Sequence, residues 1–396
     1  MSRVWDILVA GAGPAGARLA ELLARRGASV ALLDPKAPWE KPCGGGLTAA
    51  ALEHTPDLQS LRPHWQLVSE MFLATPSGAS VTVPLRRPFA VVSREALAWW
   101  GLERATRAGA RFLARAVRSV ERDGDGWRVT DGGGEVHHAR RLVGADGAAS
   151  TLRPRLAPRL RPALEPTRVA YPTSGAPPGV AAVLLFPRCG GYLWDFPRPG
   201  HHSVGIGVAP GSFARGVLDW VIAEYGTGDG GAVRHQGAAI ATTAWQSGRF
   251  ADLGSSDYAL LGDAAGLADP VTGEGIDYAF RSAALAAATF DERRGFARYP
   301  AAARRVFVPE IRRSRLVQYL VYRPAVIESL IRGARRWAVA ATATMALADV
   351  INEHLPLTHI PWRALLPDGR DRARAEQLVA NGCVLTSAPA ASPGGP

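Results

Sequence analysis

The amino-acid sequence predicts an α/β unit combined with an antiparallel β-sheet unit and a C-terminal helical region. Three observations predict this fold class. An apolar run near the N-terminus leads into closely spaced glycines and a helical pattern, short strand-like segments with Pro- and Gly-rich turns fill the middle of the chain, and helical periodicity follows residue 300. With 396 residues, 47% of them hydrophobic, the chain is long enough to form more than one core.

Composition and missing motifs exclude several classes of protein. Cys43, Cys189 and Cys383 lie far apart with no C-x-x-C spacing, so we expect neither a zinc or iron–sulfur site nor a disulfide framework. The chain contains no P-loop, no G-x-S-x-G elbow and no H-E-x-x-H sequence. We recognise no signal peptide and no apolar run of the roughly 20 residues that a membrane span needs, and we therefore expect a cytoplasmic protein.

The N-terminal segment predicts a dinucleotide site. An apolar strand at residues 4–10 is followed by G-A-G-P-A-G at residues 11–16, by a helical pattern, and by a second strand at residues 28–33 that ends in an aspartate. In such a βαβ unit the three glycines allow a tight turn, close approach of a pyrophosphate and close helix–strand packing, while the carboxylate accepts hydrogen bonds from a ribose. The predicted binding residues here are Gly11, Gly13, Ala15, Gly16 and Asp34.

Two later strands end in related glycine-rich sequences. Residues 141–150 end in G-A-D-G, and residues 258–266 end in G-D-A-A-G before D-P-V-T-G-E-G-I leads into a helix at residues 277–288. The N-terminus of that helix can stabilise negative charge on a reduced flavin. In this order the three segments resemble the FAD-binding sequences of the flavoprotein monooxygenase and reductase superfamily. The resemblance implies non-covalent FAD, with contacts at Asp263, Pro270, Gly273, Gly275 and Ile276.

Two further motifs narrow the resemblance. K-P-C-G-G-G-L at residues 41–47 and G-Y-L-W-D-F-P at residues 191–197 are similar to motifs of the geranylgeranyl reductase family, although Cys189 stands where that family usually has a proline. The resemblance covers about residues 1–300. It implies a cysteine beside the isoalloxazine, glycines that let the cofactor approach, an arginine near the flavin phosphates and a backbone contact near the adenine. The corresponding residues are Cys43, Gly44, Gly46, Arg94 and Ala116.

The aromatic residues of the second motif alternate along one strand. Tyr192, Trp194 and Phe196 share a face because side chains of a strand repeat every second residue. Such a face is either an ordinary sheet core or, as the family implies, the floor of an apolar pocket over the flavin. We predict that Cys43, Tyr192 and Trp194 are the catalytic residues.

The positions of these motifs predict the domain boundaries. The predicted units are a discontinuous Rossmann-like FAD-binding domain at residues 1–64, 92–165 and 250–300, a substrate-binding antiparallel sheet over the flavin at residues 65–91 and 166–249, a helical region at residues 301–385, and a disordered tail at residues 386–396.

The net charge of +11 reflects an excess of arginine, since only Lys36 and Lys41 are lysines. Nine arginines lie between residues 301 and 340, at positions 304, 305, 312, 313, 315, 323, 332, 335 and 336. They form either a solvated face in an arginine-rich proteome or a surface for peripheral contact with anionic lipid. Aromatic and basic residues do not alternate there, so we expect no nucleic acid partner. The oligomeric state stays open.

Three functions are compatible with the motifs. The first is an FAD-dependent reductase that saturates carbon–carbon double bonds of an isoprenoid chain. The second is a flavin monooxygenase that hydroxylates an aromatic or polyketide substrate, and the third is a non-catalytic flavin- or lipid-binding protein. The glycine-rich Cys43 loop and the aromatic strand favour the reductase. No second strand–G-x-G-x-x-G–helix unit is recognised, so NADPH bound without such a unit, or reduced ferredoxin, is expected as electron donor.

Overall fold

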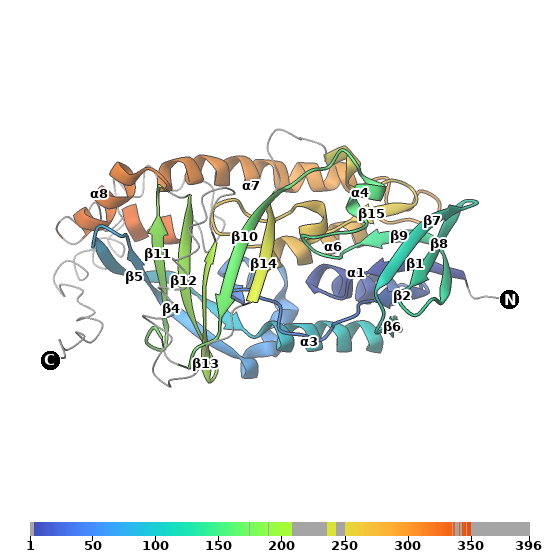
Figure 1. The fold of residues 1–396 in the computed structure, drawn as a ribbon, viewed down its shortest axis with the longest axis horizontal. Helices are drawn as coiled ribbons and strands as arrows, with labels where there is room; N and C mark the ends of the chain where they lie inside the picture. The colour runs from blue at the N-terminus through green and yellow to red at the C-terminus, as the bar shows by residue number, and fades with distance from the viewer. Residues whose placement is uncertain are drawn as a thin grey trace, which may run out of the picture.

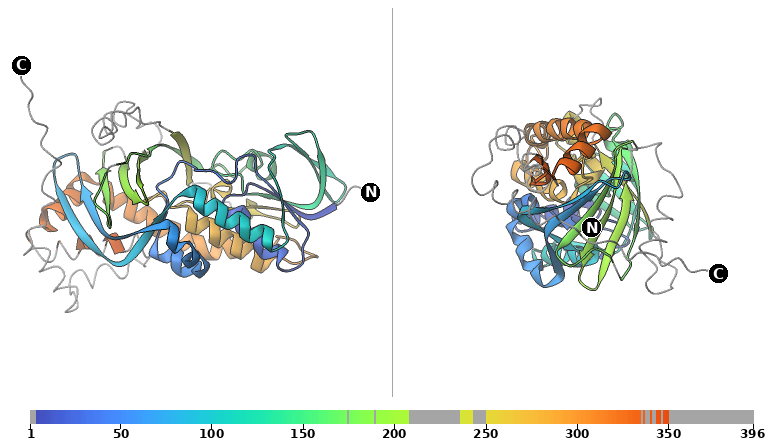
Figure 2. Two further views of the ribbon diagram at one scale, coloured as in Figure 1. Left: turned by 90° about the horizontal axis from the view of Figure 1, so that it is seen from below. Right: turned by 90° about the vertical axis from the view of Figure 1, so that its left-hand side faces the viewer.

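Two β-sheets follow one another along the long axis of an elongated molecule (Figures 1 and 2). The computed structural model describes residues 4–173, 175–188, 190–207, 236–242 and 250–334, together with positions 336, 340, 343–345 and 347–349. Cys189, most of the predicted region 301–385 beyond residue 334, and the predicted tail lie outside these residues.

A seven-stranded sheet forms the α/β half. Its order is β6-β2-β1-β9-β8-β7, and β15 pairs with the same edge of β9 as β8 does. The strands are β1 (Val4–Ala10), β2 (Val30–Leu33), β6 (Arg111–Leu113), β7 (Val117–Asp123), β8 (Gly126–Asp131), β9 (Val136–Gly144) and β15 (Tyr258–Leu260). The pairs β6–β2, β2–β1, β1–β9 and β9–β15 are parallel. All four residues of β2 are buried, as expected for a parallel strand covered on both faces. The predicted βαβ unit is confirmed.

Three longer helices accompany this sheet: α1 (Pro14–Ala24), α3 (Arg94–Arg107) and α6 (Ile276–Thr289). Helix α1 packs on β1 and β2 and contacts both α3 and α6. Shorter segments are α2 (Ala49–His54), α4 (Arg153–Leu156) and the 3₁₀ helices η1 (Pro56–His64), η3 (Phe250–Leu253) and η4 (Gly262–Ala265).

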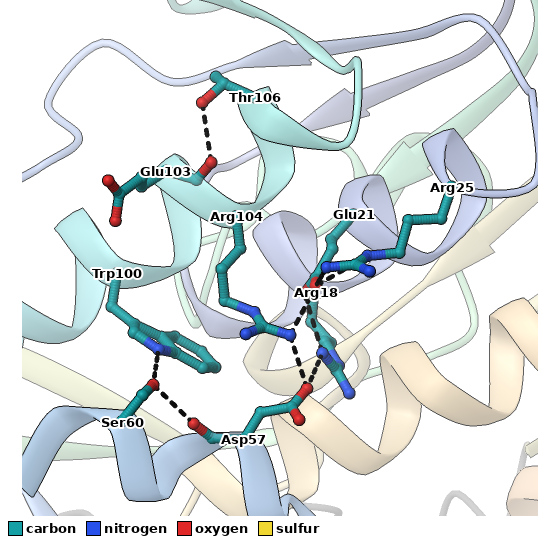
Figure 3. A network of polar contacts seen from close by, with 9 residues as sticks. All are labelled: Arg18, Glu21, Arg25, Asp57, Ser60, Trp100, Glu103, Arg104 and Thr106. Carbon is teal, nitrogen blue, oxygen red and sulfur yellow. Dashed lines mark hydrogen bonds and ion pairs between the residues drawn. The ribbon is translucent and has the colours of Figure 1, made fainter.

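An ion-pair network fixes α1, η1 and α3 relative to one another (Figure 3). The Glu21 carboxylate, 2% exposed, lies 2.9 Å from Arg18, 2.9 Å from Arg25 and 2.8 Å from Arg104. Asp57 of η1 also accepts hydrogen bonds from Arg18 and Arg104, at 2.9 Å and 2.6 Å. Burial alone would raise the pKa of Glu21, but the hydrogen bonds from Arg104 and Arg18 lower it. The buried charge is therefore compensated, and helix α1, which Gly13 caps, is held in place.

The second sheet has eight strands in the order β14-β10-β13-β12-β11-β4-β5-β3. They are β3 (Gly46–Leu47), β4 (Trp65–Ala74), β5 (Ser80–Val92), β10 (Ala163–Ala170), β11 (Val180–Phe186), β12 (Gly191–Arg198), β13 (His201–Gly207) and β14 (Gln236–Thr242).

The eight-stranded sheet departs from the predicted purely antiparallel arrangement at one place, because β4 and β11 are parallel. The chain between them passes through the seven-stranded sheet, and so long a connection permits parallel pairing where a hairpin would not. The strand β3 also joins this sheet, although residues 46–47 fall within a predicted piece of the FAD-binding domain. The exact domain boundaries stay a prediction.

Helical structure follows residue 300 as predicted, in α7 (Tyr299–Val321) and α8 (Pro324–Ala334). Figure 1 shows α7 along one long edge of the molecule, where it passes from the α/β half to the eight-stranded sheet. It contacts α6, η3 and α8, and α8 packs on β5. Within the described part of the chain, no helix combines the length and the hydropathy required to cross a membrane.

Candidate active site

The first glycine motif forms a cradle in front of α1. Gly11 has a φ of +101°, and a Cβ there would lie 2.3 Å from the Ala145 carbonyl oxygen. A Cβ on Gly16 would lie 1.8 Å from the Gly11 carbonyl oxygen, so helix and strand approach too closely for any side chain. A Cβ on Gly13, which caps α1, would meet nothing within 4 Å. The open space at the helix N-terminus fits a pyrophosphate.

Asp34 connects the end of β2 to this cradle. Its Oδ2 accepts a hydrogen bond of 2.8 Å from the N–H of Ala12, and its Oδ1 accepts bonds from two N–H groups of the following turn. The Asp34 N–H donates to the carbonyl of Leu113, at the end of the neighbouring β6. Ala116 follows that strand, and its carbonyl accepts from the N–H of Gly132 at 2.8 Å. The two predicted nucleoside contacts therefore lie at adjacent strand ends.

The third glycine motif meets the first motif and α6. A Cβ on Gly262 would lie 3.3 Å from the Cβ of Ala15. A Cβ on Gly275, the residue that caps α6, would lie 2.9 Å from Oδ1 of Asp263. The other Asp263 oxygen forms an ion pair of 2.9 Å with Nζ of Lys41. The predicted ribityl-binding carboxylate, the α6 N-terminus and the K-P-C-G loop thus converge, across 222 residues of sequence.

A tight loop leads into α6. The Asp269 side chain accepts hydrogen bonds from the N–H groups of Val271 and Thr272, at 2.8 and 2.9 Å. The N–H of Gly273 donates to the Asp269 carbonyl at 2.9 Å, and Gln318 of α7 donates to the carbonyl of Pro270 at 2.6 Å. These bonds fix the predicted flavin-contacting residues of the loop.

Glu274, in the same loop, has a buried carboxyl group. Its Oε1 accepts a hydrogen bond of 2.7 Å from the N–H of Asp277, whereas Oε2 has no hydrogen-bond partner among the described residues. Burial, together with the negative charges of Asp277 and Asp269, raises the pKa of this carboxyl well above its ordinary value. This environment favours the protonated form of the carboxyl group at the start of α6.

Cys43 lies beside Arg94 at the start of α3. Burial alone would raise the pKa of the thiol, but the charge of Arg94, the Gly45 N–H at 3.4 Å and the charge of Lys41 lower it. Arg94 is 8% exposed, and its Nε has no hydrogen-bond partner among the described residues. Ile276, the first residue of α6, belongs to the apolar cluster that packs against Cys43. The structure thus brings four predicted site elements together: this loop, α3, α6 and the Asp263 motif.

The aromatic face of β12 contacts both loops. A Cβ on Gly44 would lie 3.0 Å from the Phe196 ring and 3.3 Å from Nε1 of Trp194, and Tyr192 donates a hydrogen bond from its hydroxyl to the carbonyl of Thr272. The Tyr192 and Trp194 rings are 5.9 Å apart. The face is therefore the surface where the Cys43 loop and the Asp269–Gly275 loop meet.

Arg198 was missed by the motif analysis, although it follows Phe196 at the same spacing of two and so shares the aromatic face. Its side chain is fully buried and lies 2.7 Å from Glu40, and it donates a 2.7 Å hydrogen bond to the Cys43 carbonyl. Glu40 in turn accepts a hydrogen bond from the Arg94 N–H. The pair joins β12, the cysteine loop and α3.

Lys41 was also missed as a site residue. Its partner Asp263 could not be identified from spacing, because the two residues are distant in sequence. The sequence does offer one indication that Lys41 belongs to the site: it is one of only two lysines in the chain, and it lies inside the cysteine motif.

The chain is similar in sequence to known proteins over most of its length. Residues 6–164 match the family model described as lycopene cyclase protein. The chain is 33% identical over 312 residues to geranylgeranyl diphosphate reductase of Rhodobacter capsulatus, which covers 72% of this chain and 75% of that protein. It is 29% identical over 315 residues to menaquinone reductase of Mycolicibacterium smegmatis, covering 71% and 75%.

Solved structures share the fold. The geranylgeranyl bacteriochlorophyll reductase-like protein of Thermoplasma acidophilum superposes with a TM-score of 0.69 at 19% identity, covering 96% of this chain and 99% of that one. Halogenase PltM, solved with phloroglucinol and FAD, gives a TM-score of 0.64 at 17% identity, covering 96% and 86%.

The fold and the site define an oxidoreductase of the FAD-binding class, in which a glycine cradle and an α6 N-terminus flank an aromatic sheet. Within that class, the chain belongs to the geranylgeranyl reductase family of FAD-dependent oxidoreductases.

Proposed function

We propose that this enzyme saturates carbon–carbon double bonds of an isoprenoid chain. The observation that carries the proposal is the contact of the Tyr192–Trp194–Phe196 face with both loops that flank the flavin position. The relatives are named as reductases of geranylgeranyl diphosphate, menaquinone and digeranylgeranylglycerophospholipid, and each of these molecules carries a polyprenyl chain.

The residues present fit FAD. We assign the pyrophosphate to the cradle of Gly11, Gly13 and Gly16, the ribose of the nucleoside to Asp34, and the ribityl chain to Asp263. The isoalloxazine would lie between the α6 N-terminus and the Cys43 loop. When reduced, the bound cofactor supplies a hydride to one alkene carbon, and the other carbon takes a proton.

An isolated alkene is a poor hydride acceptor, so positive charge must develop on carbon as the proton arrives. The faces of Tyr192 and Trp194 stabilise such charge and exclude water, because aromatic rings attract cations. Tyr192 is held by its bond to the Thr272 carbonyl, and burial raises the pKa of its hydroxyl well above the ordinary value, so the ring stays neutral. Cys43 lies at the edge of this face and would orient the chain.

The test is mass spectrometry of geranylgeranyl diphosphate after anaerobic incubation with dithionite-reduced enzyme. We expect the product to gain two hydrogen atoms for each double bond reduced. Trp194→Ala should retain FAD but lose most of this activity, whereas Trp99→Ala, a change at a tryptophan 58% exposed on α3, should not. Equal activity in wild type and Trp194→Ala would exclude the assigned face.

The same assay in air distinguishes the proposed reductase from the alternative monooxygenase, because a monooxygenase would add one oxygen atom to its substrate. Replacing dithionite by NADPH or by reduced ferredoxin tests the two proposed electron donors. We expect one of them to support repeated turnover.

A further inference from the structure

The exposed residues of α7 recur at intervals of three and four, which places them on one face of the helix. On α7 this outer face comprises Arg305, Pro309, Arg312, Leu316 and Tyr319, and the exposed residues that follow it are Arg323, in the connection at residues 322–323, and Val326 on α8. Leu316 is 52% exposed, Tyr319 60% and Val326 38%, so this stretch of the chain presents three large apolar groups to solvent. Figure 1 shows the two helices at the edge of the molecule.

The outer face is basic. Four arginines of α7 and α8 are exposed, at positions 304, 305, 312 and 332, and so is Arg323 in the connection between the helices, whereas no acidic residue of the two helices is exposed. Glu310 is only partly exposed and forms an ion pair of 2.6 Å with Arg281. Glu328 lies 3.7 Å from Arg332. Exposed apolar side chains next to an excess of exposed positive charge complement an anionic surface with an apolar interior.

The opposite side of α7 holds the flavin loop. Gln318 donates to the carbonyl of Pro270, and Tyr322 donates to that of Val271 at 3.4 Å. Ser314 donates a hydrogen bond to Asp269. One helix therefore carries the exposed basic face on one side and a wall of the candidate active site on the other.

We propose that the outer face of α7 and α8 docks on anionic phospholipid. Leu316, Tyr319 and Val326 enter the boundary between headgroups and acyl chains, and the arginines lie at the level of the phosphates. A tyrosine suits this depth because its ring is apolar and its hydroxyl is polar. A second copy of this chain fits the face less well, because a twofold contact would bring arginines opposite arginines.

The experiment is sedimentation of the FAD-loaded protein with phosphatidylcholine vesicles that contain or lack phosphatidylglycerol. We expect tighter binding to the anionic vesicles, and weaker binding as salt is added. Arg305→Gln with Arg323→Gln should weaken binding to anionic vesicles about fivefold for each arginine removed. Leu316→Ser with Tyr319→Ser should weaken it about tenfold or more.

Matched changes on α3 serve as controls: Trp99→Ser, 58% exposed, and Arg107→Gln, whose side chain is 76% exposed. These variants should bind vesicles as wild type does, and all variants should retain FAD and reduce a soluble short-chain isoprenoid diphosphate equally. Because vesicle binding needs no turnover, failure of the proposed reaction leaves this test intact.

Equal binding to both kinds of vesicle, or equal loss in the α3 variants, would overturn the proposal. So would light scattering that shows a dimer in wild type and a monomer in Leu316→Ser with Tyr319→Ser, because the face would then join two copies of the chain.

Discussion

Asp263 contacts Lys41 in the structure, and we also assign the ribityl chain of the cofactor to it. The two roles are compatible because a carboxylate has two oxygens and several acceptor positions. Lys41 then orients the carboxylate, and the N-terminus of α6 lies at its other oxygen.

Asp263→Ala should therefore weaken FAD binding by about 1–3 kcal/mol, the contribution of a hydrogen bond to a charged group. Fluorescence titration of the apoprotein with FAD measures the loss. Lys41→Gln should have a smaller effect if the carboxylate binds the cofactor directly, and Asp125→Ala, in the exposed β7–β8 turn, should have none. An unchanged affinity for FAD in Asp263→Ala would show that Asp263 does not bind the ribityl chain.

Arg94 is the main favourable charge on the Cys43 thiol. We expect Cys43 in the native enzyme to be alkylated by iodoacetamide with a midpoint below the pH typical of free thiols, about 8.5. Arg94→Gln should move this midpoint to higher pH, because the thiolate loses its cation while burial still opposes it.

Alkylation is followed by peptide mass spectrometry of the Cys43 fragment, in a background where Cys189 and Cys383 are replaced by alanine. Arg104→Gln, which removes an arginine of the same helix on the Glu21 side, is the control and should leave the midpoint unchanged. A wild-type midpoint in Arg94→Gln would show that other groups set the pKa of the thiol.

At the scale of elements, two glycines of one loop have separable tasks. Gly16→Ala places a methyl group 1.8 Å from a carbonyl oxygen, so α1 must move away from β1. We expect a loss of several kcal/mol in the free energy of unfolding, since the backbone can relax only partly. Gly13→Ala meets no neighbouring atom and should change stability by less than about 1 kcal/mol.

For Gly13→Ala we expect the loss of FAD affinity to be larger than the loss of stability. Its added methyl group occupies the space in front of α1, so affinity should fall well beyond the change in stability. Urea unfolding of the apoproteins and FAD titration separate the two effects. A Gly13→Ala protein with wild-type FAD affinity would place the phosphates elsewhere.

Elements with a strong local pattern could be predicted from the sequence. The strand at residues 4–10 and the helix that follows Gly275 lie as predicted, because apolar periodicity and glycine turns are local. The parallel pairing of β4 with β11 could not be predicted, since nothing local records which distant edge a strand joins. For the same reason, the ion pairs of Lys41 with Asp263 and of Arg198 with Glu40 could not be predicted.

At the scale of the whole molecule, Glu274 makes stability depend on pH. The folded protein keeps the Glu274 proton well above 4.5, the ordinary pKa that the unfolded chain has. Unfolding above that pH releases a proton, so this group lowers the free energy of unfolding as pH rises, by up to about 1.4 kcal/mol per pH unit. Below pH 4.5 both states are protonated and the effect vanishes.

Glu274→Gln keeps an acceptor for the Asp277 N–H and has no proton to lose. It should match wild type in acid and become progressively more stable than wild type towards neutral pH. Urea unfolding at several pH values measures the difference, with Glu121→Gln, 61% exposed, as the control that should show no such trend. A difference that does not vary with pH would mean that Glu274 is ionised in the folded protein.

The interleaved path of the chain has a consequence for biosynthesis. Strand β1 is made first, but β9 must be added on one side of it and β15 pairs only after about two thirds of the chain has left the ribosome. Contacts so distant in sequence form slowly, and groups of strands from the two sheets alternate along the chain. Since Asp263 and the start of α6 come after β15, the proposed cofactor site is assembled only in the last third of translation, and until then the edge of β9 that pairs with β15 is open.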